Sequence, residues 1–221
     1  MNRGRRIVAE AVGTAFLVTA VIGSGIMGDR LAGGNVAIAL LANTVATGAA
    51  LVALILVLGP ISGAHFNPAV SLSALCQRDL SWADAIAYIS TQLISGCAGA
   101  VIANTMFGEA AVSVSRHARN GAGQVFSEVV GAFGLVLIIA IGARVRPQMV
   151  AFAVAGYITA AYWFTASTSF ANPAVTVARS LSDTFAGIRP RDVPLFILAQ
   201  LAGAGAATLL AAWLLKEQRD D

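Results

Sequence analysis

The chain carries one short motif twice, as Asn67-Pro68-Ala69-Val70-Ser71 and as Asn172-Pro173-Ala174-Val175-Thr176. The side-chain oxygen of an Asn at a helix N-cap can accept a hydrogen bond from a backbone N–H of the first turn. A Pro fits the next position, where a backbone N–H would lack a partner, and the small Ala keeps the helix tip narrow. One copy would be an ordinary helix start, but two copies predict two short helices with matching tips.

The sequence around the motif is repeated as well. Residues 9–16 (AEAVGTAF) resemble residues 127–134 (SEVVGAFG), and residues 91–96 (TQLISG) resemble residues 199–204 (AQLAGA). Matches that occur in the same order in both halves indicate a duplication. We therefore expect one membrane domain over residues 1–221, with a first repeat at about 7–107 and a second repeat at about 123–215.

The composition places the chain in a lipid bilayer. Hydrophobic residues make up 57% of the 221 residues and charged residues 11%, whereas roughly 25% of an average soluble domain is charged. The apolar residues form blocks of about twenty, the length that crosses a hydrocarbon core of about 30 Å as a helix. We expect an all-α membrane protein with six transmembrane helices, at residues 7–28, 36–58, 82–107, 125–143, 149–167 and 193–215.

The two motif segments lie between these spans. Residues 59–81 and 168–190 are too short and too broken to cross the bilayer, so they suit re-entrant half-helices. Each repeat has an odd number of spans, so the repeats are inverted and their half-helix tips point at each other across the midplane. The amide nitrogens of Asn67 and Asn172 should then face whatever passes between them, while the positive dipole ends oppose cations.

Charge and the remaining residue patterns exclude several classes of function. The first six residues hold three Arg and no acid, which favours an amino terminus on the cytoplasmic side of the cell membrane. An even number of spans then puts the carboxyl terminus on the same side. The basic residues are scattered, so the pI near 9.3 does not indicate a nucleic-acid partner. No pattern predicts a disulfide framework, a metal site, a cofactor or a catalytic group, so we expect no enzyme.

Residues 62–70 (SGAHFNPAV) and 171–175 (ANPAV) resemble the major intrinsic protein family, which comprises the aquaporins and aquaglyceroporins. The resemblance runs from Glu10 to about Trp213. It implies an aquaporin-like fold, a passive pore for small neutral solutes within each subunit, and a homotetramer in the bilayer. Residues 168–188 also resemble a bacterial subgroup associated with arsenic-resistance genes. That likeness implies glycerol-sized polyols or undissociated arsenous acid as solutes, together with water, and urea fits the same description.

The resemblance also places a selectivity filter at four positions counted from the motifs: Thr47, Ala160, Ser169 and Val175. Family members usually carry an Arg where Val175 stands, and water-selective members carry an aromatic residue and a His where Thr47 and Ala160 stand. Small residues at all four positions imply a wide mouth that admits solutes larger than water. Arg179, one helical turn beyond Val175, either supplies a guanidinium to the mouth or binds loop carbonyls or Asp183.

Three further polar residues are candidates for a role near the pore. Glu10 and Glu128 lie in apolar spans, where an ionisable side chain is expensive. The resemblance assigns them to anchoring the re-entrant loops, and a proton relay is the alternative. His65 precedes the first motif and is expected to line the pore or to fix its loop, with a pH gate as the alternative.

Three other functions stay open at this point. A membrane junction or scaffold protein with a closed pore, which some family members resemble, would show no permeability above bare lipid. A water-selective aquaporin would share the motifs. A coupled secondary transporter would share the inverted repeats and broken helices, but it should place a charged residue or an ion-coordinating set beside them. Neither motif supplies one, so the sequence favours a passive channel.

Overall fold

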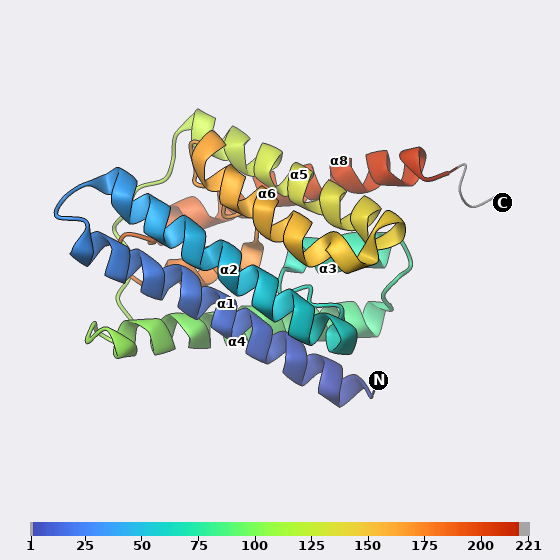
Figure 1. The fold of residues 1–221 in the computed structure, drawn as a ribbon, viewed down its shortest axis with the longest axis horizontal. Helices are drawn as coiled ribbons and strands as arrows, with labels where there is room; N and C mark the ends of the chain where they lie inside the picture. Colours follow the sequence, from blue (N-terminus) through green and yellow to red (C-terminus); the bar gives the residue numbers. More distant parts are fainter. Residues whose placement is uncertain (1, 217–221) are drawn as a thin grey trace.

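The computed structural model describes residues 2–216, whose regular secondary structure is helical. Five long helical segments have the length and apolar composition to cross a membrane: α1 (Arg3–Leu31), α2 (Val36–Ser62), α4 (Trp82–Met106), α5 (Ala122–Val145) and Pro190–Leu214, which contains α8 (Val193–Leu214). These helices run along the long axis of the molecule (Figure 1). The start of α1 and the end of α8 lie at one end of that axis, here called the terminal end. The opposite end, with the segment that joins α4 to α5, is called the loop end.

The fifth predicted span is shorter than the sequence suggests. It forms the 3-10 turn η1 (Pro147–Met149) followed by α6 (Val150–Phe164), a helix of 15 residues that is about 22 Å long at 1.5 Å per residue. Thr165 ends α6 because its backbone is extended, with φ −110° and ψ 139°. The apolar residues beyond it belong to a loop that turns back into the molecule, so the predicted span of 149–167 ends too late. Helix α6 packs against α2 and α5 (Figure 1).

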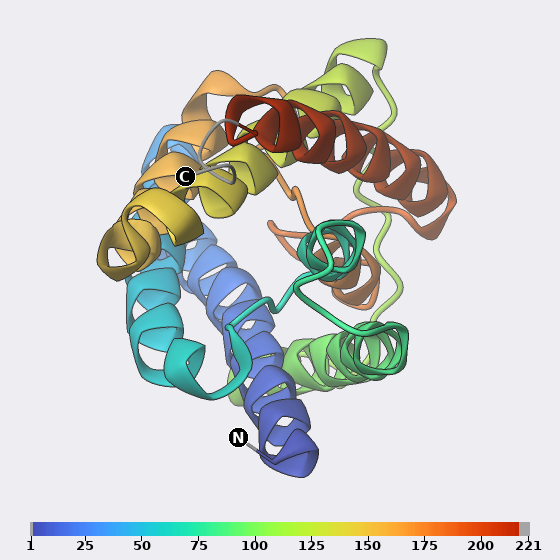
Figure 2. The same ribbon diagram turned by 90° about the vertical axis from the view of Figure 1, so that its right-hand side faces the viewer.

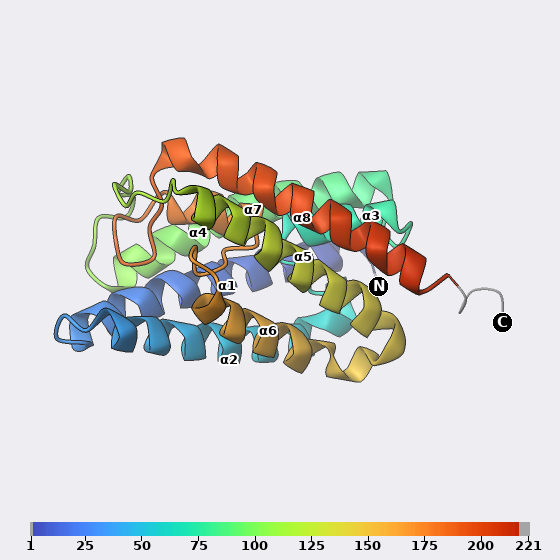
Figure 3. The same ribbon diagram turned by 90° about the horizontal axis from the view of Figure 1, so that it is seen from above.

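Two short helices begin inside the bundle, and each starts where a motif predicts it. Helix α3 (Pro68–Cys76) is capped by Asn67, whose Oδ1 accepts from the Ala69 N–H at 2.9 Å. Helix α7 (Pro173–Arg179) is capped in the same way by Asn172. The two half-helices point to opposite ends of the molecule (Figure 3). Viewed along the long axis, the other helices form a ring around them (Figure 2).

The long helices pack closely where glycines remove a side chain. Helix α1 packs against α4, and α5 packs against α8. A Cβ on Gly99 would lie 2.4 Å from the carbonyl oxygen of Ala15, and a Cβ on Gly203 would lie 2.2 Å from that of Val129. Only a glycine therefore fits at these two crossings, as is common where helices meet in membranes. Large apolar side chains such as Phe16, which is 62% exposed, cover the outside of the ring.

Candidate functional site

The loops before the two half-helices hold backbone conformations that most residues avoid. Ala64 and Phe66 have φ of 50° and 48°, and at the corresponding places in the second loop Ser169 and Ala171 have φ of 46° and 48°. Non-glycine residues in this left-handed region cost free energy and persist only where the surroundings hold them. Each loop therefore needs an anchor.

Glu10 anchors the first loop from α1. Its side chain is fully buried. It accepts four hydrogen bonds, from Ser62 Oγ at 2.7 Å, His65 N at 2.9 Å, Phe66 N at 2.8 Å and Gln92 Nε2 at 2.8 Å. Four donors satisfy the carboxylate without a buried cation beside it.

Glu128 anchors the second loop from α5 with the same set of donors. It is fully buried and accepts from Ser167 Oγ at 2.6 Å, Phe170 N at 2.9 Å, Ala171 N at 2.9 Å and Gln200 Nε2 at 2.6 Å. Both carboxylate oxygens of each glutamate accept hydrogen bonds, from the loop region and from a Gln of α4 or α8, so the geometry of both glutamates is that of a fixed structural anchor.

The two Asn side chains hold the loops to each other. Asn67 Nδ2 donates to the carbonyl oxygen of Ala171, and Asn172 Nδ2 donates to that of Phe66, both at 2.8 Å. The sequence predicts amide nitrogens that face the passage as donors, and one of the two N–H bonds on each is used between the loops instead. An NH2 group has two donors, so each Asn keeps a second N–H, and both residues line the central cavity.

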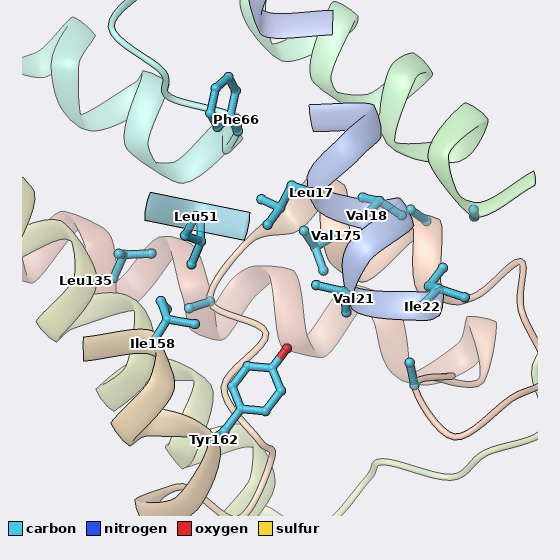
Figure 4. Close-up of a cluster of buried hydrophobic side chains, with 14 of the residues drawn as sticks. Leu17, Val18, Val21, Ile22, Leu51, Phe66, Leu135, Ile158, Tyr162 and Val175 are labelled. Carbon is cyan, nitrogen blue, oxygen red and sulfur yellow. The ribbon is translucent and has the colours of Figure 1, made fainter. Parts of the chain in front are cut away.

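A cavity of about 460 Å³ passes between the half-helix tips and the surrounding helices. Large apolar side chains from four helices point into one common space beside the tips (Figure 4). They are Leu17 and Val21 of α1, Leu51 of α2, Leu135 of α5, and Ile158 of α6. This part of the cavity is therefore walled largely by groups that cannot hydrogen-bond, and Asn67 and Asn172 are among the polar residues that line the same cavity.

One of the four predicted filter positions is wrong. Thr47, Ser169 and Val175 line the cavity, but Ala160 is exposed on the outer side of α6. The cavity-facing residues of α6 recur every fourth position, ending at Ile158 and Tyr162, and Ala160 lies half a turn away. Counting back from the second motif failed because the count assumes a fixed loop between α6 and α7.

Tyr162 is the residue that the count missed. Its hydroxyl lies 3.3 Å from Thr47 Oγ1 and both residues are buried, so this wall of the cavity carries a pair of hydroxyl groups. The fourfold spacing of apolar residues in 150–162 was the available signal for it.

Arg179 reaches the cavity. Its side chain is buried and lines the loop end of the cavity. The guanidinium carbon lies 3.4 Å from the ring centre of Phe170, and Nε donates to the carbonyl oxygen of Ala186. Asp183, which the sequence offers as a partner, instead pairs with Arg116 at 2.7 Å. The sequence poses a loop-carbonyl contact and a position at the pore as alternatives for Arg179. The structure shows both, because Arg179 binds the Ala186 carbonyl and also lines the cavity.

A second buried arginine supports the same ring. Arg119 lies in the loop between α4 and α5, with its guanidinium carbon 5.0 Å from the ring centre of Phe170. Burial lowers the pKa of Arg119 to about 10, and the charge of Glu128 opposes that shift. Nothing in the local sequence distinguishes Arg119 from the exposed Arg116.

The terminal end of the cavity is lined differently. His65 lies in its wall, with Nδ1 3.1 Å from Ser71 Oγ and its ring edge-on to Tyr88 at 5.3 Å. His65 therefore lines the cavity, and its contacts with Ser71 and Tyr88 fix its ring. At the mouth, Arg144 of α5 pairs with Asp79 at 3.1 Å, and both line the cavity.

Comparisons with known proteins identify the architecture. Residues 1–147 match the major intrinsic protein family. The chain belongs to this family. It is 53% identical over 215 residues to aquaglyceroporin AqpS of Rhizobium meliloti, covering 97% of this chain and 92% of that protein. It is 30% identical over 246 residues to a probable aquaporin AqpM of Archaeoglobus fulgidus, covering 98% and 99%.

A solved structure shares the fold of this major intrinsic protein. The aquaglyceroporin from Plasmodium falciparum superposes with a TM-score of 0.76 at 19% identity, over 96% of this chain and 95% of that one. The all-α, aquaporin-like fold that the sequence predicts is confirmed. The chain is thus a multi-pass membrane channel for small neutral solutes rather than an enzyme, in keeping with its family.

Proposed function

We propose that this chain is an aquaglyceroporin-like channel that passes glycerol-sized polyols and undissociated arsenous acid, together with water. The observation that carries the proposal is the cavity, about 460 Å³ in volume, that runs beside both capped half-helix tips. Its walls are apolar except for fixed hydrogen-bonding groups, which suits a solute with hydroxyl groups on a carbon or arsenic centre. The 53% identity to a protein named aquaglyceroporin supports the same solute class.

The tips supply donors and the loops supply acceptors. Asn67 and Asn172 each keep one amide N–H for a passing oxygen. Within residues 2–216, the backbone carbonyls of His65 and Phe170 receive no protein hydrogen bond, so they can accept from a hydroxyl group. A solute that both donates and accepts is therefore passed along, whereas a cation meets the positive ends of two helix dipoles.

The filter is proposed to lie at the loop end. It comprises Thr47, Ser169 and Val175 from the sequence prediction, with Tyr162 and Arg179 added and Ala160 removed. Because Val175 is short, the mouth beside the second motif is wider than an arginine there would leave it. The Arg179 guanidinium lies one turn further out and adds a barrier to cations.

The membrane placement and assembly follow the same proposal. The domain would be a single inverted duplication in the inner membrane, with both termini cytoplasmic, and would assemble as a homotetramer with one pore per subunit. The start of α1 and the end of α8 share the terminal end (Figure 1), and the apolar outside of the ring supports contact with lipid and with neighbouring copies.

Flux into proteoliposomes tests the function. We expect stopped-flow light scattering to show glycerol and arsenous acid entering faster than into bare vesicles, without saturation and without dependence on a proton gradient. Saturable, proton-dependent entry would support a coupled carrier instead, and water flux alone would support a water-selective aquaporin.

A variant at the second motif tests how the half-helix tips exclude cations. Asn172→Asp keeps the N-cap oxygen but removes the amide donor to Phe66 and adds a negative charge where the dipoles repel cations. A charge at such close range changes a cation barrier by a few kcal/mol at an effective dielectric constant of about 20. We expect Na⁺ leak in bilayers to rise about tenfold or more, and an unchanged conductance would contradict the assigned tip.

A further inference from the structure

Two buried arginines contact the ring of Phe170, and their hydrogen bonds differ. In Arg119 every guanidinium nitrogen has a partner, because Nε, Nη1 and Nη2 donate to the carbonyl oxygens of Gly187, Ser167 and Phe185. Arg179 commits only Nε, to Ala186. Within residues 2–216, no oxygen accepts a hydrogen bond from Nη1 or Nη2 of Arg179, although the residue is only 2% exposed.

Arg179 also lacks a negative partner. In the described part of the chain, every ion pair involves other residues, and the nearby Asp183 is held by both the backbone and the side chain of Arg116. A buried charge without a counter-charge costs several kcal/mol. Nη1 and Nη2 are not among the polar atoms that are buried without a partner in the described residues, so they open on the cavity that Arg179 lines. The Arg179 guanidinium is therefore ready to take an anion.

Arg179 lines the cavity, and so do Phe170, Tyr162 and Thr47. The guanidinium offers only donors, in a planar fork that matches two oxygens on one atom. The Tyr162 and Thr47 hydroxyls, 3.3 Å apart, add two groups that can donate. The Phe170 ring packs against the guanidinium, whose carbon lies 3.4 Å from the ring centre. The arrangement matches a small planar oxyanion in shape and in hydrogen bonding.

We propose that the loop end of the cavity is a binding site for a small monovalent oxyanion, such as the carboxylate of a one- to three-carbon acid, held by Nη1 and Nη2 of Arg179. The site is additional to the passage of neutral solutes. It lies in the same cavity, so an occupied site stands in the path of a solute.

The anion binds at this end and does not cross. The walls of the rest of the cavity include the side chains of Leu17, Val21, Leu51 and Ile158, which cannot replace water around a charge. A neutral polyol passes this stretch at lower cost. Small carboxylates therefore inhibit the channel without being its cargo, and in this respect the inference rests on the proposed function.

Inhibition of glycerol flux tests the site. Proteoliposomes are loaded and bathed in buffer at neutral pH with sodium formate, or with sodium gluconate at the same ionic strength, because gluconate is too large for the site. When formate equals its Kd, half of the sites are filled, so glycerol flux should fall about twofold relative to gluconate. Equal flux in the two salts would overturn the proposal.

Three variants separate binding at Arg179 from a general salt effect. Arg179→Gln removes the charge, Arg179→Lys keeps the charge but loses the fork, and Arg116→Gln removes an exposed arginine that is not part of the cavity wall. We expect formate to inhibit Arg116→Gln as it inhibits the unaltered protein, Arg179→Lys weakly and Arg179→Gln not at all. Equal inhibition of all four proteins would overturn the proposal.

Thermal unfolding of the purified protein gives a readout that does not depend on flux. A ligand that binds the folded state raises the Tm with its concentration. Formate should therefore raise the Tm of the unaltered protein more than gluconate does, and Arg179→Lys should lose most of this difference. If glycerol does not permeate but formate still raises the Tm, the proposed function fails and the oxyanion site stands. If glycerol permeates and formate neither slows it nor raises the Tm, the oxyanion site fails.

Discussion

The two re-entrant loops share a framework and differ in what they present to the cavity. Glu10 and Glu128 accept from the same kinds of donor, a serine hydroxyl, two loop N–H groups and a glutamine amide. Two residues before the Asn, however, the first loop has His65 and the second has Phe170. Seven residues after it, α3 has Ala74 where α7 has Arg179.

All four of these residues line the cavity, one pair toward each end. The comparison shows that the contacts that hold the loops are duplicated, while the chemistry of the two mouths is set by a few positions that the duplication left free. Substitutions at those positions should therefore change which solutes pass the two mouths, whereas substitutions at the anchors should change stability. The following predictions test this separation, from the largest expected effect to the smallest.

The two anchors, Glu10 and Glu128, should contribute equally to the stability of the folded protein. Glu10→Gln and Glu128→Gln each replace one accepting oxygen with an NH2 group. The groups around it are also donors, so at least one buried N–H is left without an acceptor. We expect each to lower the free energy of unfolding by about 2–4 kcal/mol, measured by denaturation of the purified protein in detergent.

Glu109→Gln is the matched control for this prediction. Glu109 pairs with Arg30 at 2.7 Å, but both side chains are at least 40% exposed, so its loss should cost under about 1 kcal/mol. A large loss at one anchor and none at the other would break the equivalence of the two loops.

Much of this framework follows from local sequence. The N-caps Asn67 and Asn172 and the start of each half-helix depend on adjacent residues, so the motif alone predicts them. Glu10 and Glu128 are recognisable because the same residue recurs in two apolar spans at the same place in the repeat. Features carried by neighbouring residues or by the duplication are therefore accessible to sequence reasoning.

Features that depend on how distant segments meet are not accessible in this way. The cross-linking bonds of the Asn side chains arise only because the loops approach each other. The side of α6 that faces the cavity depends on the length and path of the following loop, so counting from the motif points to the exposed Ala160, whereas Tyr162 lines the cavity. Arg119 is buried by segments far along the chain, and a polar loop gives no sign of this.

The filter prediction at Val175 tests the asymmetry of the mouths. Val175→Arg adds a second guanidinium one turn from Arg179 and fills space in the cavity wall. We expect glycerol flux to fall about tenfold, which is about 1.4 kcal/mol in barrier height, and water flux to fall much less, both by stopped-flow light scattering. Val175→Leu adds volume without charge and should slow glycerol less than Val175→Arg. Equal slowing of water and glycerol by Val175→Arg would contradict a size filter at this position.

The smallest effect should come from the exposed pair at the loop end. Hydrogen bonds from the backbone and side chain of Arg116 hold the pKa of Asp183 below its ordinary value. A carboxyl group with a lowered pKa in the folded state stabilises that state above its unfolded pKa of about 3.9. This contribution is lost as the pH falls through the lower, folded-state pKa. Because the Arg116 side chain is exposed, solvent screens the pair, which should be worth under about 1 kcal/mol.

Thermal unfolding as a function of pH measures this contribution. The Tm of Asp183→Asn should lie slightly below that of the unaltered protein at neutral pH, and the two curves should converge below the folded-state pKa. Raising the salt concentration should shrink the difference, because the Arg116 side chain is 90% exposed. A large, salt-independent difference would mean that Asp183 also supports the buried Arg179 region. The loop end would then owe its distinct chemistry to an acid as well as to the two arginines.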